Sequence, residues 1–188
     1  MKNLKSIALA LVVVLSTLSV TAQTKKVDTS KSSIKWLAKK VTGQHNGIIN
    51  IKDGALVFKG KKLVGGTFTA DMTTINDLDL TGDYKGKLEG HLKSEDFFST
   101  AKFATSTLVF KTIGAKGKDV YTVTADLTIK GITNPVTFDI TVTDNSATTK
   151  FMVNRTKYDI KYGSKSFFES IGDKAIYDEF ELTVNLTF

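Results

Sequence analysis

Hydrophobic and polar residues alternate along several stretches of the chain, and this period of two is the pattern of half-buried β-strands. The clearest stretch is 121–129, where every second residue is apolar and the intervening residues are threonine or aspartate. Further stretches with this period, some of them weaker, lie at 34–41, 48–58, 64–72, 103–111, 136–142, 148–155 and 176–188. The chain is therefore predicted to consist mainly of β-strands.

Turn-forming sequences separate these stretches and favour short antiparallel connections. Asn46-Gly47 and Asp53-Gly54 are dipeptides typical of tight hairpins. The single proline, Pro135, stands at the start of a predicted strand, where its missing N–H is tolerated. These signals predict about eight strands without a β-α-β rhythm, arranged as an all-β sandwich or barrel.

One segment, 83–98, has the spacing of a helix instead of a strand. Its residues at i, i+4, i+7 and i+8 would share one helix face; they are Tyr84, Leu88, His91 and Leu92. Ser94, followed by two acidic residues, is expected to cap a helix start. Phe97 and Phe98 are then expected to turn into the β-structure beneath this helical insertion.

Alternation alone does not say which face of the strands points inward. Polar residues outside an apolar interior describe a soluble barrel of lipocalin type, whereas the opposite arrangement describes a small integral outer-membrane barrel. The helical insertion and the consecutive apolar residues at 48–49 and 56–58 favour the apolar interior. In the stretch 64–72 the expected inner face comprises Val64, Gly66, Phe68, Ala70 and Met72.

The first 22 residues have the layout of a secretory signal peptide. Lys2 and Lys5 precede an apolar run at 7–18, and small residues end at Ala22. The run is too short to span a membrane. We expect cleavage after Ala22, a single domain at 23–188 and a periplasmic location.

Composition narrows the chemistry that the mature chain could perform. Its formal charge falls from +7 to +5 once Lys2 and Lys5 are removed, and the lysines are too dispersed to favour nucleic-acid binding. The sequence contains no cysteine, so neither disulfides nor thiol catalysis are expected. His45 and His91 have no ligand-like neighbour at helical spacing, and the EF-hand-like start at 77–83 has leucine at its twelfth position. We expect no metal site and no enzymatic activity.

Arg155 is the charged residue that alternation places on an inner face, in line with Phe151 and Val153. A buried guanidinium needs a partner that accepts its hydrogen bonds and balances its charge. That partner is either a carboxylate of the protein or an anionic group of a ligand, and both remain open.

Four blocks of sequence carry a resemblance to a known family. Residues 39–51 (KKVTGQHNGIINI) are similar to its K-V-T-G-x-H segment, and residues 90–110 to its H-L-x-S-x-D-F-F signature. Residues 127–140 (LTIKGITNPVTFDI) resemble its L-T-I-x-G-x-T-x-P-V block. Residues 154–163 resemble its N-R-x-x-F-G-I segment, with Asp159 where glycine is usual. The chain thus resembles the YceI-like family of exported lipid- or polyisoprenoid-binding proteins.

The resemblance implies a lipocalin-like, eight-stranded antiparallel barrel with a short helical insertion and an amphiphile along its pore. The matching motifs imply ligand contacts at Lys40, His45, His91, Leu92, Phe97, Phe98, Arg155 and Tyr158. We add aromatic residues of the predicted strands, namely Trp36, Phe68, Phe110 and Phe138.

The function expected from these observations is that of a periplasmic carrier for a long-chain amphiphile. The ligand would be a polyisoprenoid or fatty-acid-like lipid, with quinone as one example, and no other cofactor is expected. The alternative is the small outer-membrane barrel. Transient contact with a membrane surface and a homodimer through exposed edge strands are the further partners considered.

Overall fold

The strands expected from alternation are present, and they form one antiparallel sheet that closes on itself. The computed structural model describes residues 21–170 and 172–188, so the expected signal peptide lies almost entirely outside the described residues. The strands are β1 (Ala22–Lys26), β2 (Ser33–Lys40), β3 (Gly43–Lys59), β4 (Lys62–Asp77), β5 (Thr105–Gly117), β6 (Val120–Ile129), β7 (Ile132–Val142), β8 (Ser146–Asn154) and β9 (Ile176–Thr187). The helical segments are α1 (Gly82–Lys93) and the 3-10 turns η1 (Arg155–Tyr158) and η2 (Gly172–Lys174).

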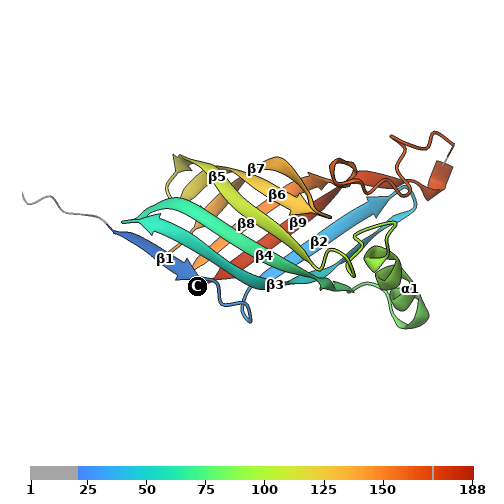
Figure 1. Cartoon of the computed structure of the whole chain (residues 1–188), viewed down its shortest axis with the longest axis horizontal. Helices are drawn as coiled ribbons and strands as arrows, with labels where there is room; N and C mark the ends of the chain where they lie inside the picture. The colour runs from blue at the N-terminus through green and yellow to red at the C-terminus, as the bar shows by residue number, and fades with distance from the viewer. Residues whose placement is uncertain (1–20, 171) are drawn as a thin grey trace, which may run out of the picture.

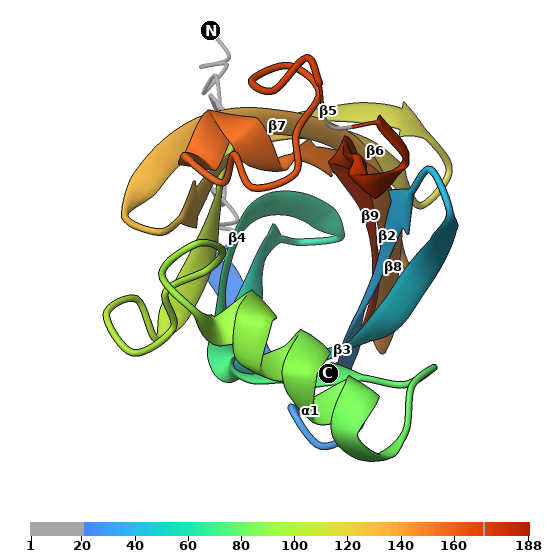
Figure 2. The same cartoon turned by 90° about the vertical axis from the view of Figure 1, so that its right-hand side faces the viewer.

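Eight of these strands, β2 to β9, form a closed barrel in which neighbours in the ring pair antiparallel. The ring closes at β3, which pairs with β2 through one edge and with β4 through the other, while β1 extends the edge used by β2. Figure 1 shows the strands running obliquely along the length of the barrel, and Figure 2 shows α1 lying across one end. The predicted eight-stranded antiparallel barrel with a short helical insertion is confirmed.

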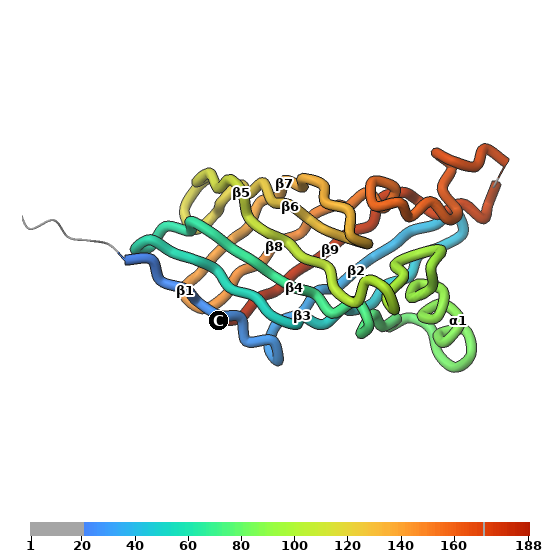
Figure 3. The backbone as a smooth tube through the Cα atoms, viewed as in Figure 1, coloured from blue at the N-terminus to red at the C-terminus, as the bar shows by residue number. Residues whose placement is uncertain are grey.

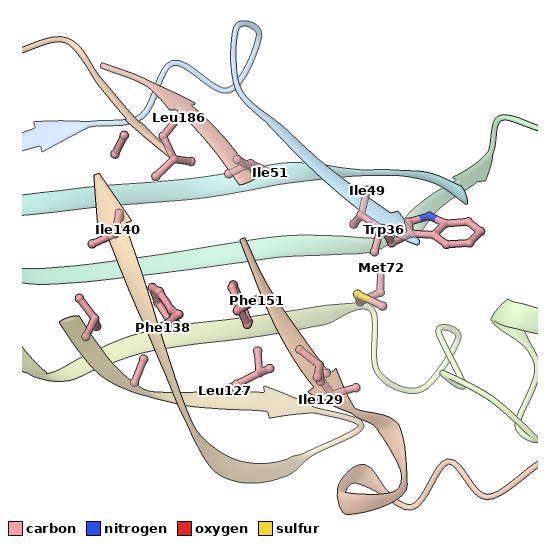
Figure 4. Close-up of a cluster of buried hydrophobic side chains, with 14 of the residues drawn as sticks. Trp36, Ile49, Ile51, Met72, Leu127, Ile129, Phe138, Ile140, Phe151 and Leu186 are labelled. Atoms are coloured by element: carbon pink, nitrogen blue, oxygen red, sulfur yellow. The ribbon is translucent and has the colours of Figure 1, made fainter. Parts of the chain in front are cut away.

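The apolar face of each strand points into the barrel. In β6, Val123, Ala125, Leu127 and Ile129 are buried, whereas in β7 the outward-facing residues Thr137, Asp139 and Thr141 are exposed. Figure 4 shows apolar side chains of different strands converging on the interior. This parity is that of an apolar core, and it contradicts the alternative of a polar lumen within an apolar exterior. No helix among residues 21–170 and 172–188 is long and apolar enough to cross a membrane.

The two predicted hairpin dipeptides are not turns; both lie inside β3. A Cβ atom on Gly47 would stand 1.9 Å from the Asn76 carbonyl oxygen and 2.5 Å from the Trp36 ring. A Cβ on Gly54 would stand 2.6 Å from the Phe68 ring. Both glycines therefore allow a neighbouring side chain to pack directly against the β3 backbone. Besides forming turns, glycine occurs within strands at such places of close approach.

Replacing Gly47 by alanine is expected to destabilise the barrel by at least about 2 kcal/mol, because neither the Asn76 backbone nor the buried indole can move away cheaply. The matched control is Gly86→Ala in α1, where an added Cβ meets nothing within 4 Å. Helix propensity predicts that this control gains about 0.5–1 kcal/mol. Urea unfolding of both variants measures the difference, and effects of equal sign would contradict this packing.

One predicted inner face is interrupted. Leu63 is buried, whereas Val64 is 49% exposed and points outward, contrary to the prediction. The register between β3 and β4 shifts where Phe58 pairs with Leu63 and Val57 with Gly65. Such an irregularity moves the side chains on its far side to the opposite face.

The helical insertion is shorter than predicted and ends at Ser94 instead of restarting there. The Ser94 N–H and Oγ both donate to the His91 carbonyl oxygen, at 3.1 and 2.8 Å, and so satisfy an acceptor at the C-terminus of α1. Tyr84, expected on the buried stripe, is 76% exposed, while Leu92 is buried. Phe97 and Phe98 turn inward as predicted and are both buried.

Candidate functional site

The barrel contains an apolar cavity to which each of the strands β2 to β9 contributes side chains. About 850 Å³ of space there is free of protein atoms, including the solvent at its mouth. The cavity volume open to water is about 100 Å³, well above the ~10–15 Å³ that one water requires. Its lining is Ile34, Ile49, Ile51, Phe68, Thr69, Ala70, Met72, Phe98, Ser106, Thr107, Leu108, Phe110, Leu127, Ile129, Phe138, Ile140, Thr149, Phe151, Phe180, Leu182, Val184 and Leu186. The side chains of the barrel interior therefore do not fill it.

Aromatic rings form one wall of the cavity. The ring centroids of Phe68 and Phe110 are 5.6 Å apart, those of Phe110 and Phe138 6.0 Å, and Phe138 stacks on Phe151 at 4.6 Å. The absence of a side chain at Gly66 makes this row possible, because a Cβ there would stand 2.7 Å from the Phe110 ring. Rings present large, rigid apolar surfaces, which suits contact with a hydrocarbon chain.

Two small side chains on adjacent strands widen the cavity beside this wall. Ala70 on β4 pairs in register with Ser106 on β5, and both line the cavity. The Ser106 hydroxyl is buried and has no hydrogen-bond partner in the described part of the chain. It is a polar group that could bond to a ligand, and sequence reasoning missed it because serine breaks the apolar pattern.

A cluster built around Arg155 occupies the end of the barrel near α1. The side chain is 2% exposed. Its Nε donates to the Tyr177 carbonyl oxygen at 3.1 Å, Nη1 donates to the carbonyl oxygens of Ile160 and Tyr162 at 2.9 and 2.7 Å, and Nη2 donates to that of Ile176 at 3.0 Å. The guanidinium thus joins η1, the segment after it and the start of β9.

Asp178 supplies the negative charge next to this guanidinium. Its Oδ1 lies 3.5 Å from Arg155 Nη2. Burial lowers the pKa of Arg155, and the charge of Asp178 opposes that shift. Burial would raise the pKa of Asp178, but hydrogen bonds from Ser164 and Ser166 and the charge of Arg155 hold it below its ordinary value. Of the two partners left open for Arg155, the structure shows the internal one, which is the carboxylate of Asp178.

Asp159 has the left-handed αL conformation, which accounts for the glycine usual at this place in the motif and is tolerated by aspartate. The residue has φ 58° and ψ 32°, a region that glycine occupies freely and that aspartate tolerates better than most residues. Its carboxylate pairs with Lys161 at 2.7 Å and not with Arg155. The substitution therefore leaves the Arg155 cluster unchanged.

Tyr158 lies beside the cluster with its hydroxyl buried and unpaired among the residues described. Burial raises its pKa to about 12. Between pH 10 and 12 the unfolded chain therefore releases this proton while the folded chain keeps it. The stability linked to it is complete below about pH 10 and is lost as pH rises toward 12, by about 2–3 kcal/mol.

Tyr158→Phe is expected to remove that alkaline loss, and at pH 7 it should be neutral or slightly stabilising because an unpaired buried hydroxyl disappears. The measurement is urea unfolding of both proteins at several pH values between 7 and 12. Parallel alkaline losses in the two proteins would show that another group is responsible.

The predicted site residues separate into three groups. Phe68, Phe98, Phe110 and Phe138 line the cavity. His91, Leu92, Phe97, Arg155 and Tyr158 belong to the end of the barrel near α1, where the His91 ring lies 5.5 Å from Phe97 and the Arg155 guanidinium 5.7 Å from the Phe97 ring. Trp36, Lys40 and His45 are not part of the cavity lining: Trp36 packs on Gly47, Lys40 ends β2, and His45 pairs with Asp79.

Phe98 connects the end cluster to the cavity. Its ring lies 5.3 Å from that of Phe97 and 6.5 Å from that of Phe180, and both Phe98 and Phe180 line the cavity. In Figure 3 the segment between η1 and β9 projects from the same end of the barrel as α1. Alternation identifies inward positions such as Leu182 and Val184, but it does not indicate which of them border empty space.

The sequence of this chain is similar to those of a known domain family and of several curated proteins. Residues 26–188 match the sequence model of the YceI-like domain. A UPF0312 protein of Shewanella denitrificans is 34% identical over 91 residues, which are 48% of this chain and 46% of that protein. The chain thus spans about half the length of the curated relatives it matches.

Solved structures of other proteins share the fold, and two of them are compared with this chain. BcnA of Burkholderia cenocepacia matches with a TM-score of 0.71 and 22% identity, over 86% of this chain and 99% of that one. A polyisoprenoid binding domain from Saccharophagus degradans, described as implicated in plant cell wall breakdown, matches with a TM-score of 0.58 and 10% identity, over 86% and 95%. At these identities the similarity establishes the barrel architecture alone.

Proposed function

This chain belongs to the YceI-like family, and we propose that it carries one long-chain amphiphile, a polyisoprenoid or fatty-acid-like lipid, in the cavity of its barrel. The observation that carries the proposal is the cavity lining, in which the polar side chains among the described residues are Thr69, Ser106, Thr107 and Thr149. Each methylene buried there contributes about 0.8 kcal/mol. A hydrocarbon tail can therefore bind tightly without a charged contact.

A related fold supports the choice of ligand class. The Saccharophagus degradans domain is described as polyisoprenoid binding, and the cavity here has the apolar, aromatic-walled lining that an isoprenoid chain requires. The buried hydroxyl of Ser106, which has no partner among the described residues, offers a polar contact within that lining. The tail would lie along the aromatic wall, with its polar end toward a mouth of the barrel.

We propose binding without catalysis. Among the described residues, the cavity lining includes no side chain that titrates, so it offers neither a general base nor an activated nucleophile. Incubation of a bound lipid with the protein, followed by mass spectrometry of the extract, should return the lipid unchanged. A time-dependent product would overturn this part of the proposal.

We also propose that the protein is periplasmic, that it contacts a membrane surface transiently and that it forms a homodimer. Export rests on the signal-peptide pattern of residues 1–22. Contact with a membrane surface is favoured by Tyr162, Phe167 and Phe168, each about half exposed, in a segment that also carries Lys161 and Lys165. Sedimentation with anionic vesicles tests that contact, and analytical ultracentrifugation tests the proposed homodimer.

Chain length provides the direct test of the carrier function. Delipidated protein should bind saturated fatty acids with an affinity that increases by about 0.8 kcal/mol per methylene, or roughly fourfold, until the cavity is full. Displacement of a fluorescent fatty acid measures each affinity. An affinity independent of chain length would mean that the tail does not enter the barrel.

A further inference from the structure

Three residues with metal-binding side chains meet at the end of the barrel near α1. His45 lies near the start of β3, Asp77 is the last residue of β4, and Asp79 lies in the loop that leads to α1. One ligand atom from each lies within 4.8 Å of the other two. Figure 1 shows how β4 continues through this loop into α1. The sequence distance between β3 and the loop explains why local spacing did not reveal the group.

Backbone groups hold the two carboxylates in place. Asp79 Oδ1 accepts the Asn46 N–H at 2.7 Å, and its Oδ2 lies 2.8 Å from His45 Nδ1. Asp77 Oδ1 accepts the N–H groups of Asp79 and Leu80, at 3.2 and 2.7 Å. These bonds position both side chains before any cation arrives, which is the arrangement that a preformed site needs.

The second carboxylate oxygen of Asp77 is the independent indication that a cation binds here. Asp77 is 0% exposed, and its Oδ2 has no hydrogen-bond partner among residues 21–170 and 172–188. The ammonium of Lys85 bonds to the Asp77 carbonyl oxygen and pairs with Glu89. A buried carboxylate oxygen without a donor is costly, and a cation shared with Asp79 and His45 would remove that cost.

We propose that His45, Asp77 and Asp79 form a Zn²⁺ site, with one imidazole nitrogen and one oxygen of each carboxylate as ligands. One nitrogen and two oxygens suit Zn²⁺, which binds such ligands at about 2.0–2.2 Å and accepts a water in the fourth position. Ca²⁺ prefers six to eight oxygens and fits this set poorly. The ion would fasten the loop before α1 to β3.

The test uses the mature chain, treated with a chelator and then titrated with Zn²⁺ by calorimetry and with Co²⁺ by visible absorption. We expect one ion per chain, and at a free Zn²⁺ concentration 100 times Kd the ratio of folded to unfolded protein should rise about 100-fold. Asp77→Asn should weaken Zn²⁺ binding at least 100-fold. Asp83→Asn, which changes an exposed carboxylate at the start of α1, should bind as tightly as the wild type.

His45→Gln is the second variant, in case Asp77→Asn does not fold. It should also lose Zn²⁺ binding and the Co²⁺ absorption band, while binding of the fluorescent fatty acid is retained. Absence of saturable Zn²⁺ binding by the wild-type chain would overturn the proposal. Equal binding by the folded variants and the wild type would overturn it as well.

Discussion

Ala70→Phe will lower the affinity for a long-chain lipid at least 100-fold while the barrel stays folded. Ala70 lies on β4, lines the cavity and pairs in register with another small residue, Ser106. A phenyl ring at this position occupies space that is empty, so it meets little of the resistance that overpacking of a filled core produces. The ring displaces a hydrocarbon tail over at least four methylenes, each worth about 0.8 kcal/mol, and together they account for a loss of more than 100-fold.

Thr67→Phe is the matched control, because Thr67 lies on the same strand and is exposed on the outside of the barrel. It adds the same ring without entering the cavity, and its lipid affinity should equal that of the wild type. Displacement of the fluorescent fatty acid measures both variants, and circular dichroism confirms that both are folded. Wild-type affinity in a folded Ala70→Phe protein would show that the ligand binds elsewhere.

Arg155→Leu is expected to reduce the free energy of unfolding by about 3–5 kcal/mol, the cost of removing one partner from a buried ion pair. Four carbonyl oxygens would lose their donor, and Asp178 would lose the cation beside it. Arg155→Lys should recover only part of this stability, because an ammonium has three donors and cannot match the planar guanidinium. Urea unfolding at pH 7 measures both variants.

The neighbouring Lys157→Leu is the control, because Lys157 is exposed and its side chain makes no bond in the described residues. Its stability should differ from the wild type by less than about 0.5 kcal/mol. The folded fraction of Arg155→Lys should bind the fluorescent fatty acid as the wild type does. A stable variant that has lost lipid binding would instead assign Arg155 to the ligand head group.

The fold could be predicted to the level of strand number and parity, because period-two alternation reports directly which side of a strand is buried. The prediction of turns was wrong at two glycines, because glycine occurs both in tight turns and at places of close packing within a strand. Gly47 and Gly54 follow Asn and Asp, which locally favours a turn, yet the packing of Trp36 and Phe68 against them keeps β3 continuous. Only the residues that pack against such a glycine in the folded protein show whether it lies in a turn or within a strand.

Only part of the candidate site could be predicted, because alternation shows which side chains point inward but not how they pack against one another. Phe68, Phe98, Phe110 and Phe138 line the cavity, and their inward direction follows from periodicity and from the family motif. Whether an inward side chain borders empty space or fills a gap depends on the sizes of side chains across the barrel, as Ala70 and Ser106 show. The hydrogen-bond partners of Arg155 could not be predicted from the sequence either. They include backbone carbonyl oxygens whose positions depend on how the segment after η1 folds.

The most direct test of the carrier proposal is mass spectrometry of the mature protein, purified without detergent, under native conditions and again after organic extraction. We predict one extra mass per folded chain, which extraction converts into a free molecule with a long hydrocarbon tail. Ala70→Phe purified in the same way should lack that mass. A folded wild-type chain that carries no lipid and takes none up from added polyprenol would contradict the proposal.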